Sequence, residues 1–388
     1  MLFQTQDYKL EFIKIILMRL ISKKKIEQFR ESLREKKIDL ALFLTSEPIH
    51  DINIEYFTGF QQTRYYSFSC LLMNQKNTTL IVSPISYDRA LKEAEADEII
   101  NLEKYDRSLI KVLREKLKKV KTVGILEEIF PSRFYRRFKK IKFQDINDII
   151  LEIRSIKEPK EIERIKKACG IANHGIKVIK ENLSKKITDK ELGLILEQEL
   201  IRKGADELSF PTIITSGKRS VFIHPYPSFL NKKLQPGLGL VDFGVRYKGY
   251  CSDITVPFTL GKITEKQKKI VQTVQEAYET TIDNLKIDVP TWKVHESVEN
   301  LIKKNGFELK HGLGHGLGLE LHDLPSITSK PKYKEQLKEW KEVKLKKNMV
   351  FTIEPGIYVP GIGGCRLEND ILMDRKPKSL TSSRLINF

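Results

Sequence analysis

Hydrophobic positions in the first part of the chain alternate between helical and strand-like spacing. Ile26, Phe29 and Leu33 recur at helical spacing among polar residues, and the sequence then changes to short, continuous apolar runs. Helices that alternate with short strands up to about residue 150 predict a separate α/β domain. The predicted elements are a helix over 22–37, strands over 38–44, 70–73 and 78–82, and helices over 87–96 and 108–119.

The pattern changes after a charged segment at 153–162. Pro159 fits the first turn of a new helix, and Thr188 with Glu191 has the spacing of a capping box. We therefore expect an optional N-terminal extension at 1–21, an α/β domain at 22–152 and a larger α+β domain at 153–388. The larger domain is predicted to hold strands over 212–215, 238–243, 251–260, 349–353 and 366–373, helices over 159–181, 188–203, 264–285 and 294–304, and an exposed helical insert over 331–347.

Composition narrows the class of protein. Lys and Arg number 69 against 51 Asp and Glu, a net charge of +18, but the basic residues are spread along the chain and no basic block alternates with aromatics. A solvated lysine-rich surface is therefore favoured over a nucleic-acid footprint, with 23–25 and 330–347 as the only basic candidates. Four cysteines without CxxC spacing disfavour a disulfide scaffold or thiolate zinc site and indicate a reducing compartment. No apolar run approaches the roughly 18 residues of a membrane span, and no signal peptide is recognised, so a cytoplasmic location is expected.

Two pairs of carboxylates stand at the ends of apolar strands. Asp242 ends one strand, and Asp253 lies in the strand that returns from it, so a hairpin would place the two side by side. Glu354 and Glu368 repeat the arrangement in the second strand group. Any one of these residues alone would be an ordinary turn residue. Opposed carboxylates in an apolar sheet cannot all stay ionised without positive charge, so together they predict bound cations.

A glycine-rich segment adds an imidazole to this set. Residues 311–322 hold three of the seven histidines, at His311, His315 and His322, and glycines there suit close approach of backbone to a ligand. Four carboxylates with His315 exceed the needs of a single zinc site but suit two divalent ions about 3.5 to 4 Å apart. Oxygen-rich ligation favours manganese or cobalt, while zinc and iron stay possible.

These residues occur in motifs whose order resembles that of the pita-bread-fold metallopeptidases, in particular the proline-directed branch of Xaa-Pro dipeptidases (prolidases) and Xaa-Pro aminopeptidases. The resemblance implies an α+β catalytic domain with a curved antiparallel sheet covered by helices. Residues 22–150 are similar to the creatinase-type N-terminal domain of that family. The motifs are Phe210-Pro-Thr-Ile-Ile-Thr-Ser-Gly217, His224-Pro225, Asp242-Phe-Gly, Gly249-Tyr-Cys-Ser-Asp253, His315-Gly-Leu-Gly, Glu354-Pro-Gly and Arg366-Leu-Glu368.

The family resemblance also implies roles for the metal ligands. Asp242 would bind one metal, Asp253 and Glu368 would bridge both metals, and His315 with Glu354 would complete the second. A hydroxide held between the metals would be the nucleophile, with Glu354 as the proton carrier.

Further residues are implied to surround the substrate. His224 and His322 would stabilise the oxyanion beside it, and His311 would line the same pocket. Arg366 would bind substrate or hold a carboxylate, with an ordinary strand arginine as the equal alternative.

The activity implied is hydrolysis of the bond between an N-terminal residue and a following proline, by a homodimer with two divalent ions per subunit. Asp323-Leu-Pro325 stands where prolidases often have Glu-x-Pro, so dipeptidase and aminopeptidase both stay open. Methionine aminopeptidases fit less well, because they typically lack an N-terminal domain and have a longer interval between the two glutamates. The alternative from another class is a nucleic-acid or chaperone-type binding protein on the same fold, suggested by the charge of +18.

Overall fold

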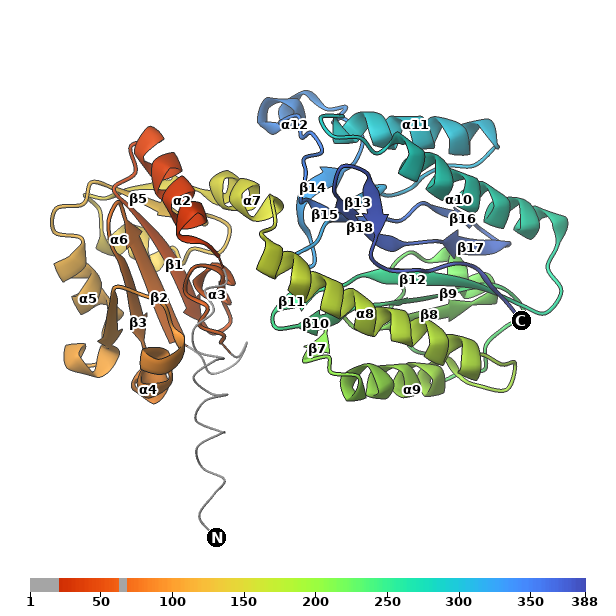
Figure 1. Cartoon of the computed structure of the whole chain (residues 1–388), viewed down its shortest axis with the longest axis horizontal. Coiled ribbons are helices and arrows are strands. Elements are labelled where there is room, and N and C mark those ends of the chain that lie inside the picture. The colour runs from red at the N-terminus through yellow and green to blue at the C-terminus, as the bar shows by residue number, and fades with distance from the viewer. Residues whose placement is uncertain (1–20, 63–67) are drawn as a thin grey trace, which may run out of the picture. The chain divides into compact units, whose positions relative to one another are not determined.

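The computed structural model describes residues 21–62 and 68–388, and the expected extension at 1–21 lies almost wholly outside this range. The chain forms two compact units, divided between Ile153 and Arg154 (Figure 1). The division falls at the start of the charged segment. No helix in the described residues is long and apolar enough to cross a membrane.

The first unit is built on a mixed sheet with strand order β4-β3-β2-β1-β5-β6. Strands β1, β2 and β3 are antiparallel neighbours, while β4, β5 and β6 join the sheet in parallel. The helix α4 begins at Pro84, three residues earlier than its apolar pattern predicts, because proline fits the first helical turn. The elements are α2 (Lys23–Glu35), β1 (Leu40–Ser46), α3 (Asn53–Thr58), β2 (Phe68–Asn74), β3 (Thr78–Val82), α4 (Pro84–Glu93), β4 (Glu98–Asn101), the 3₁₀ helix η1 (Leu102–Tyr105), α5 (Leu109–Lys116), β5 (Thr122–Ile125), α6 (Arg133–Arg137), β6 (Lys142–Asp145) and α7 (Asn147–Ser155).

The second unit has two main sheets, each with its own pair of helices. The predicted capping box of Thr188 and Glu191 is confirmed at the start of α9. The first half contains α8 (Pro159–Asn182), α9 (Asp189–Arg202), β7 (Glu207–Leu208), β8 (Ile213–Ser216), η2 (Gly217–Val221), β9 (Gly237–Phe243), β10 (Val245–Tyr247), β11 (Tyr250–Cys251) and β12 (Ile254–Leu260). The second half contains α10 (Glu265–Asn284), α11 (Thr291–Lys304), β13 (Gly314–Gly316), β14 (Asp323–Ile327), α12 (Lys334–Glu339), β15 (Val350–Ile353), β16 (Gly356–Val359), β17 (Gly363–Arg366), β18 (Asn369–Met373), β19 (Pro377–Ser379) and β20 (Ile386–Asn387).

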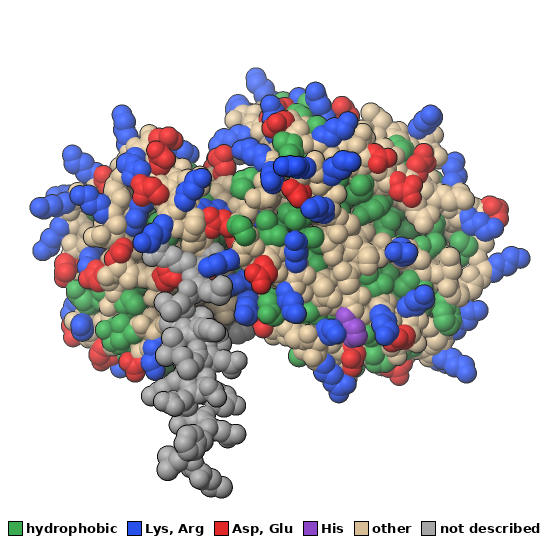
Figure 2. Space-filling view, in the orientation of Figure 1, with side chains coloured by type: hydrophobic (Ala, Val, Ile, Leu, Met, Phe, Trp, Pro, Cys, Tyr) green, Lys and Arg blue, Asp and Glu red, His purple; other side chains and the backbone are tan. Residues whose placement is uncertain are grey.

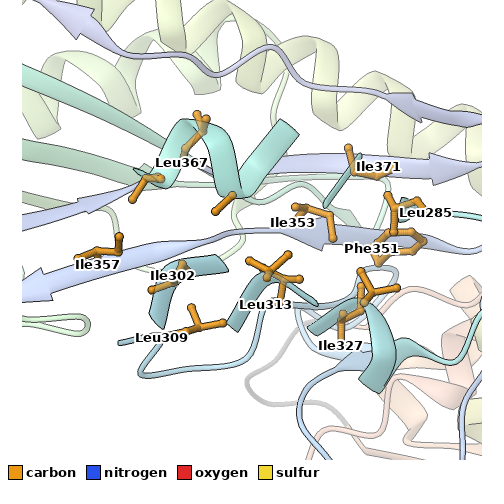
Figure 3. Close-up of a cluster of buried hydrophobic side chains, with 14 of the residues drawn as sticks. Leu285, Ile302, Leu309, Leu313, Ile327, Phe351, Ile353, Ile357, Leu367 and Ile371 are labelled. Atoms are coloured by element: carbon orange, nitrogen blue, oxygen red, sulfur yellow. The ribbon is translucent and has the colours of Figure 1, made fainter. Parts of the chain in front are cut away.

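Two hydrophobic cores hold these layers together. Helices α8 and α9 pack through residues such as Ala172 and Leu196 on the sheet β20-β12-β9-β8. Helices α10 and α11 cover the sheet β14-β13-β15-β18-β19, where Ile302, Leu313 and Phe351 belong to one buried cluster (Figure 3). Burying an aliphatic or phenyl side chain is worth about 1.5–3 kcal/mol, so each core fixes its strands firmly. The two sheets thereby hold the strand ends that carry the predicted ligands.

Two predicted strands are interrupted in the structure. The segment predicted as one strand over 251–260 divides into β11 and β12, with Asp253 in the break, and the segment over 366–373 divides into β17 and β18, with Glu368 in the break. At each break the backbone N–H of the carboxylate residue forms a hydrogen bond outside the regular strand pairing. The Asp253 N–H donates to Asp370 Oδ2 at 3.2 Å, and the Glu368 N–H donates to Thr255 O at 3.2 Å. The expectation of continuous strands was wrong because both breaks occur where a carboxylate leaves the sheet pattern.

Candidate metal centre

The first carboxylate pair lies on neighbouring antiparallel strands. Asp242 of β9 is directly opposite Thr255 of β12, and Asp253 precedes Thr255 by two residues. Asp253 lies in the break just before β12, so it is not paired directly with Asp242 as a simple hairpin would predict, but the charge of Asp242 still contributes to a raised pKa of Asp253, after the effect of burial. Both residues are buried: Asp242 is 6% exposed and Asp253 is 5% exposed.

The second carboxylate pair lies at the end of another antiparallel pair. Ile353 of β15 is opposite Asn369 of β18, so Glu354, which follows β15, and Glu368, which precedes β18, meet at the same end of the ladder. The separate hairpin β16–β17 spans the residues between them. Thr255 Oγ1 donates to Glu368 Oε2 at 2.7 Å and so connects this pair to the first.

His315 of β13 directs one ring nitrogen at these carboxylates. Its Nδ1 is 3.1 Å from Gly316 O, and the tautomer that donates this hydrogen bond leaves Nε2 as an acceptor. Nε2 lies 3.5 Å from Asp253 Oδ2 and 3.8 Å from Glu354 Oε1. One ligand atom each from Asp253, His315 and Glu368 lie within 4.8 Å of one another, which is the spacing of a metal site.

The electrostatics of the cluster call for added positive charge. Burial, followed by the charges of neighbouring carboxylates, raises the pKa of both Asp253 and Glu368 well above its usual range. Burial also raises the pKa of Glu354. Oδ1 of the buried Asp242 has no hydrogen-bond partner among the described residues. Carboxylate oxygens and one imidazole nitrogen in this state fit divalent cations.

Arg366 supports one of these carboxylates. Its guanidinium, in a residue that is 2% exposed, contacts Asp242 Oδ2 through Nη2 and donates to Thr255 Oγ1 and Tyr358 OH, both at 2.9 Å. Burial opposes the charge of Arg366, but Tyr358 and Asp242 outweigh it and hold the arginine pKa well above its usual range. Arg366 is thus in direct contact with the carboxylate of Asp242, and a role in holding that carboxylate stays a prediction.

The remaining histidines surround the cluster. His311 Nδ1 donates to Gly312 O at 2.7 Å, and its Nε2 accepts from Tyr358 OH at 3.1 Å; burial lowers the His311 pKa to about 4, so the ring is neutral. The exposed His322 has its ring centroid 4.2 Å from that of His315. Burial raises the pKa of Asp242 while the charges of Arg366 and His224 lower it, which places the exposed His224 within electrostatic range of the cluster.

Several supporting residues were not found by sequence reasoning. Thr255 connects Glu368 to Arg366, and Tyr358 connects His311 to Arg366. Asp370 accepts from the Asp253 N–H and, at 3.2 Å, from the Cys169 thiol. Thr255 and Asp370 each follow a predicted ligand by two residues, so the period of a strand could have placed them on the same face. Tyr358 has no such signal, because it lies on the separate hairpin β16–β17 and not two residues from a predicted metal ligand.

Close backbone approach explains two glycines of the histidine-rich segment. A Cβ on Gly314 would lie 2.0 Å from Thr352 O, and a Cβ on Gly316 would lie 2.1 Å from Leu324 O. Both obstacles are main-chain atoms of neighbouring strands. The glycines therefore allow β13 to fit between β14 and β15, which brings His315 to the carboxylates.

The substitution Gly316→Ala is expected to lower the free energy of unfolding of the second unit by about 1–3 kcal/mol, because backbone must move to admit the methyl group. Urea denaturation of metal-free protein, followed by tryptophan fluorescence, measures this. Gly170→Ala is the control, since a Cβ there meets nothing within 4 Å and an alanine in α8 should raise stability by up to about 1 kcal/mol. Equal urea midpoints for the two variants would contradict the steric argument.

Known proteins match the chain over both units. Residues 163–375 match metallopeptidase family M24, and residues 25–156 match the creatinase/prolidase N-terminal domain. An Xaa-Pro dipeptidase of Pyrococcus furiosus is 31% identical over 93% of this chain and 98% of its own. The crystal structure of the prolidase from Pyrococcus horikoshii OT3 has a TM-score of 0.81 at 30% identity, covering 94% of this chain and 99% of that one. The crystal structure of the X-Pro aminopeptidase from Thermotoga maritima MSB8 has a TM-score of 0.78 at 28% identity, covering 92% of this chain and 100% of that one.

These matches confirm the resemblance inferred from the sequence and the fold class that it implies, a creatinase-type N-terminal domain followed by an α+β pita-bread domain. The family model covers more than half of the chain, and the dipeptidase relative is aligned over nearly its whole length. The chain therefore belongs to metallopeptidase family M24.

Proposed function

We propose that this metallo-exopeptidase hydrolyses the Xaa-Pro bond of dipeptides. The proposal rests on one observation: ligand atoms of Asp253, His315 and Glu368 lie within 4.8 Å of one another, and Asp242 and Glu354 lie next to them. The dipeptidase reading is preferred because the relatives from two Pyrococcus species are named Xaa-Pro dipeptidases, while cleavage at the N-terminus of longer peptides, as the Thermotoga maritima relative's name indicates, is the second candidate.

The five residues Asp242, Asp253, His315, Glu354 and Glu368 would hold two divalent ions, with Asp253 and Glu368 central and shared. When bound, the ions supply Lewis-acid activation of water and of the scissile carbonyl. Manganese and cobalt are the first ions to test, followed by zinc and iron. Arg366 keeps Asp242 in place, and Thr255 does the same for Glu368.

The histidines and Glu354 would act on the substrate itself. His224 and His322 are exposed at the cluster, where an imidazole N–H can donate to the carbonyl oxygen as negative charge develops on it. His311 is fixed by Gly312 and Tyr358 and would line the pocket. Glu354 lies 4.0 Å from His311 Nδ1 and 3.8 Å from His315 Nε2, and its carboxylate would accept the proton that the attacking water gives up and pass it to the proline nitrogen as the C–N bond breaks.

The nucleic-acid or chaperone alternative is not favoured. Lys and Arg side chains on the visible face are dispersed among acidic and apolar ones (Figure 2). In the basic segment 330–347, Lys338 pairs with Glu335 at 2.7 Å, and the Lys330 ammonium lies 3.8 Å from the centroid of the Trp292 ring. Of the helical insert expected over 331–347, the structure forms the short exposed helix α12 (Lys334–Glu339), in which Lys338 is paired with an acidic neighbour.

Release of proline from Met-Pro is expected in the presence of manganese or cobalt and is expected to stop on chelation, because both activation of water and polarisation of the carbonyl need the ions. The assay compares Met-Pro with Met-Ala, which lacks the imino nitrogen, and with a Met-Pro-Xaa tripeptide. Cleavage of the tripeptide alone would make the enzyme an Xaa-Pro aminopeptidase. Absence of cleavage of all three by folded, metal-loaded protein would overturn the proposal.

The homodimer inferred from the family resemblance is a separate prediction. Sedimentation equilibrium should give twice the chain mass of 45.1 kDa. A mass of one chain at micromolar concentration would contradict it.

A further inference from the structure

Three charged side chains are buried together where the chain leaves the histidine-rich segment 311–322. Asp323 Oδ2 lies 3.3 Å from Arg154 Nη2 and 3.7 Å from Lys157 Nζ. The side chains of Asp323 and Lys157 are each 1% exposed, and that of Arg154 is 5% exposed. We call Arg154, Lys157 and Asp323 the buried ion triad. Removing charges from water costs several kcal/mol per ion, so a triad at this depth adds little net stability.

The buried ion triad is connected through the backbone of Asp323 to both histidines of the site. Asp323 directly follows His322, and as the first residue of β14 it pairs across the ladder with Gly316, which directly follows His315. The two imidazole centroids are 4.2 Å apart. The Asp323 backbone is therefore bonded in sequence to one histidine and paired in the sheet beside the other.

The chain between the two histidines is also fixed to the triad. A Cβ on Gly318 would lie 2.6 Å from Asp323 Oδ2 and 3.4 Å from Lys157 Cε, so the loop passes directly against the charged groups. Gly318 O accepts from the Cys251 N–H at 2.8 Å, and Leu319 O accepts from Nη1 of the buried Arg246 at 2.5 Å. The loop 317–322 thus has its middle held by β10 and β11 and its end held by the triad.

We propose that Asp323 is a positioning residue, held by Arg154 and Lys157, that sets the relative orientation of the His315 and His322 rings. The proposal rests on the roles given to these histidines in the proposed function. Asp323 itself touches neither substrate nor metal. Its carboxylate fixes the start of β14, and the start of β14 fixes where the His322 ring stands beside His315.

The test uses Asp323→Asn, which removes the charge, and Asp323→Glu, which keeps it. Val298→Ala is the control for lost stability, because it opens a cavity in the apolar core beneath α11 without touching a polar group. The first readout is the set of 13Cε1 resonances of histidine-labelled, metal-free protein, in which seven histidines are present. The second is kcat and KM for Met-Pro at saturating manganese, with bound metal measured.

Asp323→Asn is expected to move the His315 and His322 resonances while His174 stays in place, and to lower kcat by about 10–100-fold with metal content retained. Asp323→Glu should lie closer to wild type in both readouts. Gly318→Ala, which keeps all three charges and presses on Asp323, should shift the His322 resonance in case Asp323→Asn does not fold.

Unmoved His315 and His322 resonances in both Asp323→Asn and Gly318→Ala would overturn the proposal, as would a loss of kcat no larger than that of Val298→Ala. Wild-type protein that does not cleave Met-Pro would defeat the proposed function. The resonances of the metal-free variants would still decide the positioning role.

Discussion

Asp253→Asn is expected to lower kcat for Met-Pro by about 1000-fold or more, because the proposed shared ligand carries several kcal/mol of transition-state stabilisation through the ions it holds. The amide keeps the shape of the side chain and the hydrogen bond from the Asp253 N–H to Asp370, so the strands should stay in place. What disappears is the negative charge 3.5 Å from His315 Nε2. Steady-state kinetics at saturating manganese, with metal content determined in parallel, measure the effect.

A control of similar burial separates this effect from the loss of any buried acid. Asp189 is 6% exposed and accepts from the backbone N–H groups of Leu230 and Lys232, in the same unit but outside the carboxylate cluster. Asp189→Asn should reduce stability and leave kcat within about twofold of wild type, as expected for a substitution outside the reacting groups. If Asp253→Asn kept more than a tenth of the wild-type kcat, Asp253 would not be a shared ligand.

The parts of the site that sequence could predict are those carried by local patterns. Asp242 and Glu354 each stand at the end of a run of apolar residues, which fixes both the strand and the position of the carboxylate at its end. His315 lies among regularly spaced glycines, and this spacing is the local pattern that indicated close approach of the backbone there. The family motifs join these pieces in order, and the matched domains confirm the resemblance.

The parts that sequence could not predict depend on partners distant along the chain. Arg154 and Asp323 are 169 residues apart, and nothing in the charged segment at 153–162 indicates which acid its cations bind. The strand break at Glu368 likewise depends on a distant residue. The Glu368 N–H donates to the backbone carbonyl of Thr255, whereas in a continuous strand it would donate to a neighbouring strand of the same sheet. Register between strands is a tertiary property, and single-strand patterns do not determine it.

Removing metal is expected to lower the urea midpoint of the second unit, and to lower it more at pH 8.5 than at pH 7. Burial, and then neighbouring carboxylates, raise the pKa of Asp253 and Glu368, so above the ordinary carboxyl pKa of about 4 the folded metal-free protein binds more protons than the unfolded chain. Stability then falls as pH rises, by about 1.4 kcal/mol per pH unit for each proton retained. Divalent ions bind the deprotonated carboxylates, so their stabilisation grows over the same range.

We choose the range above pH 7 because, below it, buried histidines make the free energy of unfolding rise with pH, which opposes the effect of the carboxylates. Burial lowers the pKa of His295 and His311, so stability gained from keeping these rings neutral rises with pH up to the ordinary histidine pKa of about 6.5 and is constant above it. Trp292 and Trp340, the two tryptophans of the chain, both belong to the second unit, so their fluorescence follows this unit's unfolding. In chelator, Asp253→Asn should show a shallower fall with pH than wild type, because one retained proton is removed. A wild-type midpoint that rises between pH 7 and 8.5 in chelator would contradict the proposed protonation of the cluster.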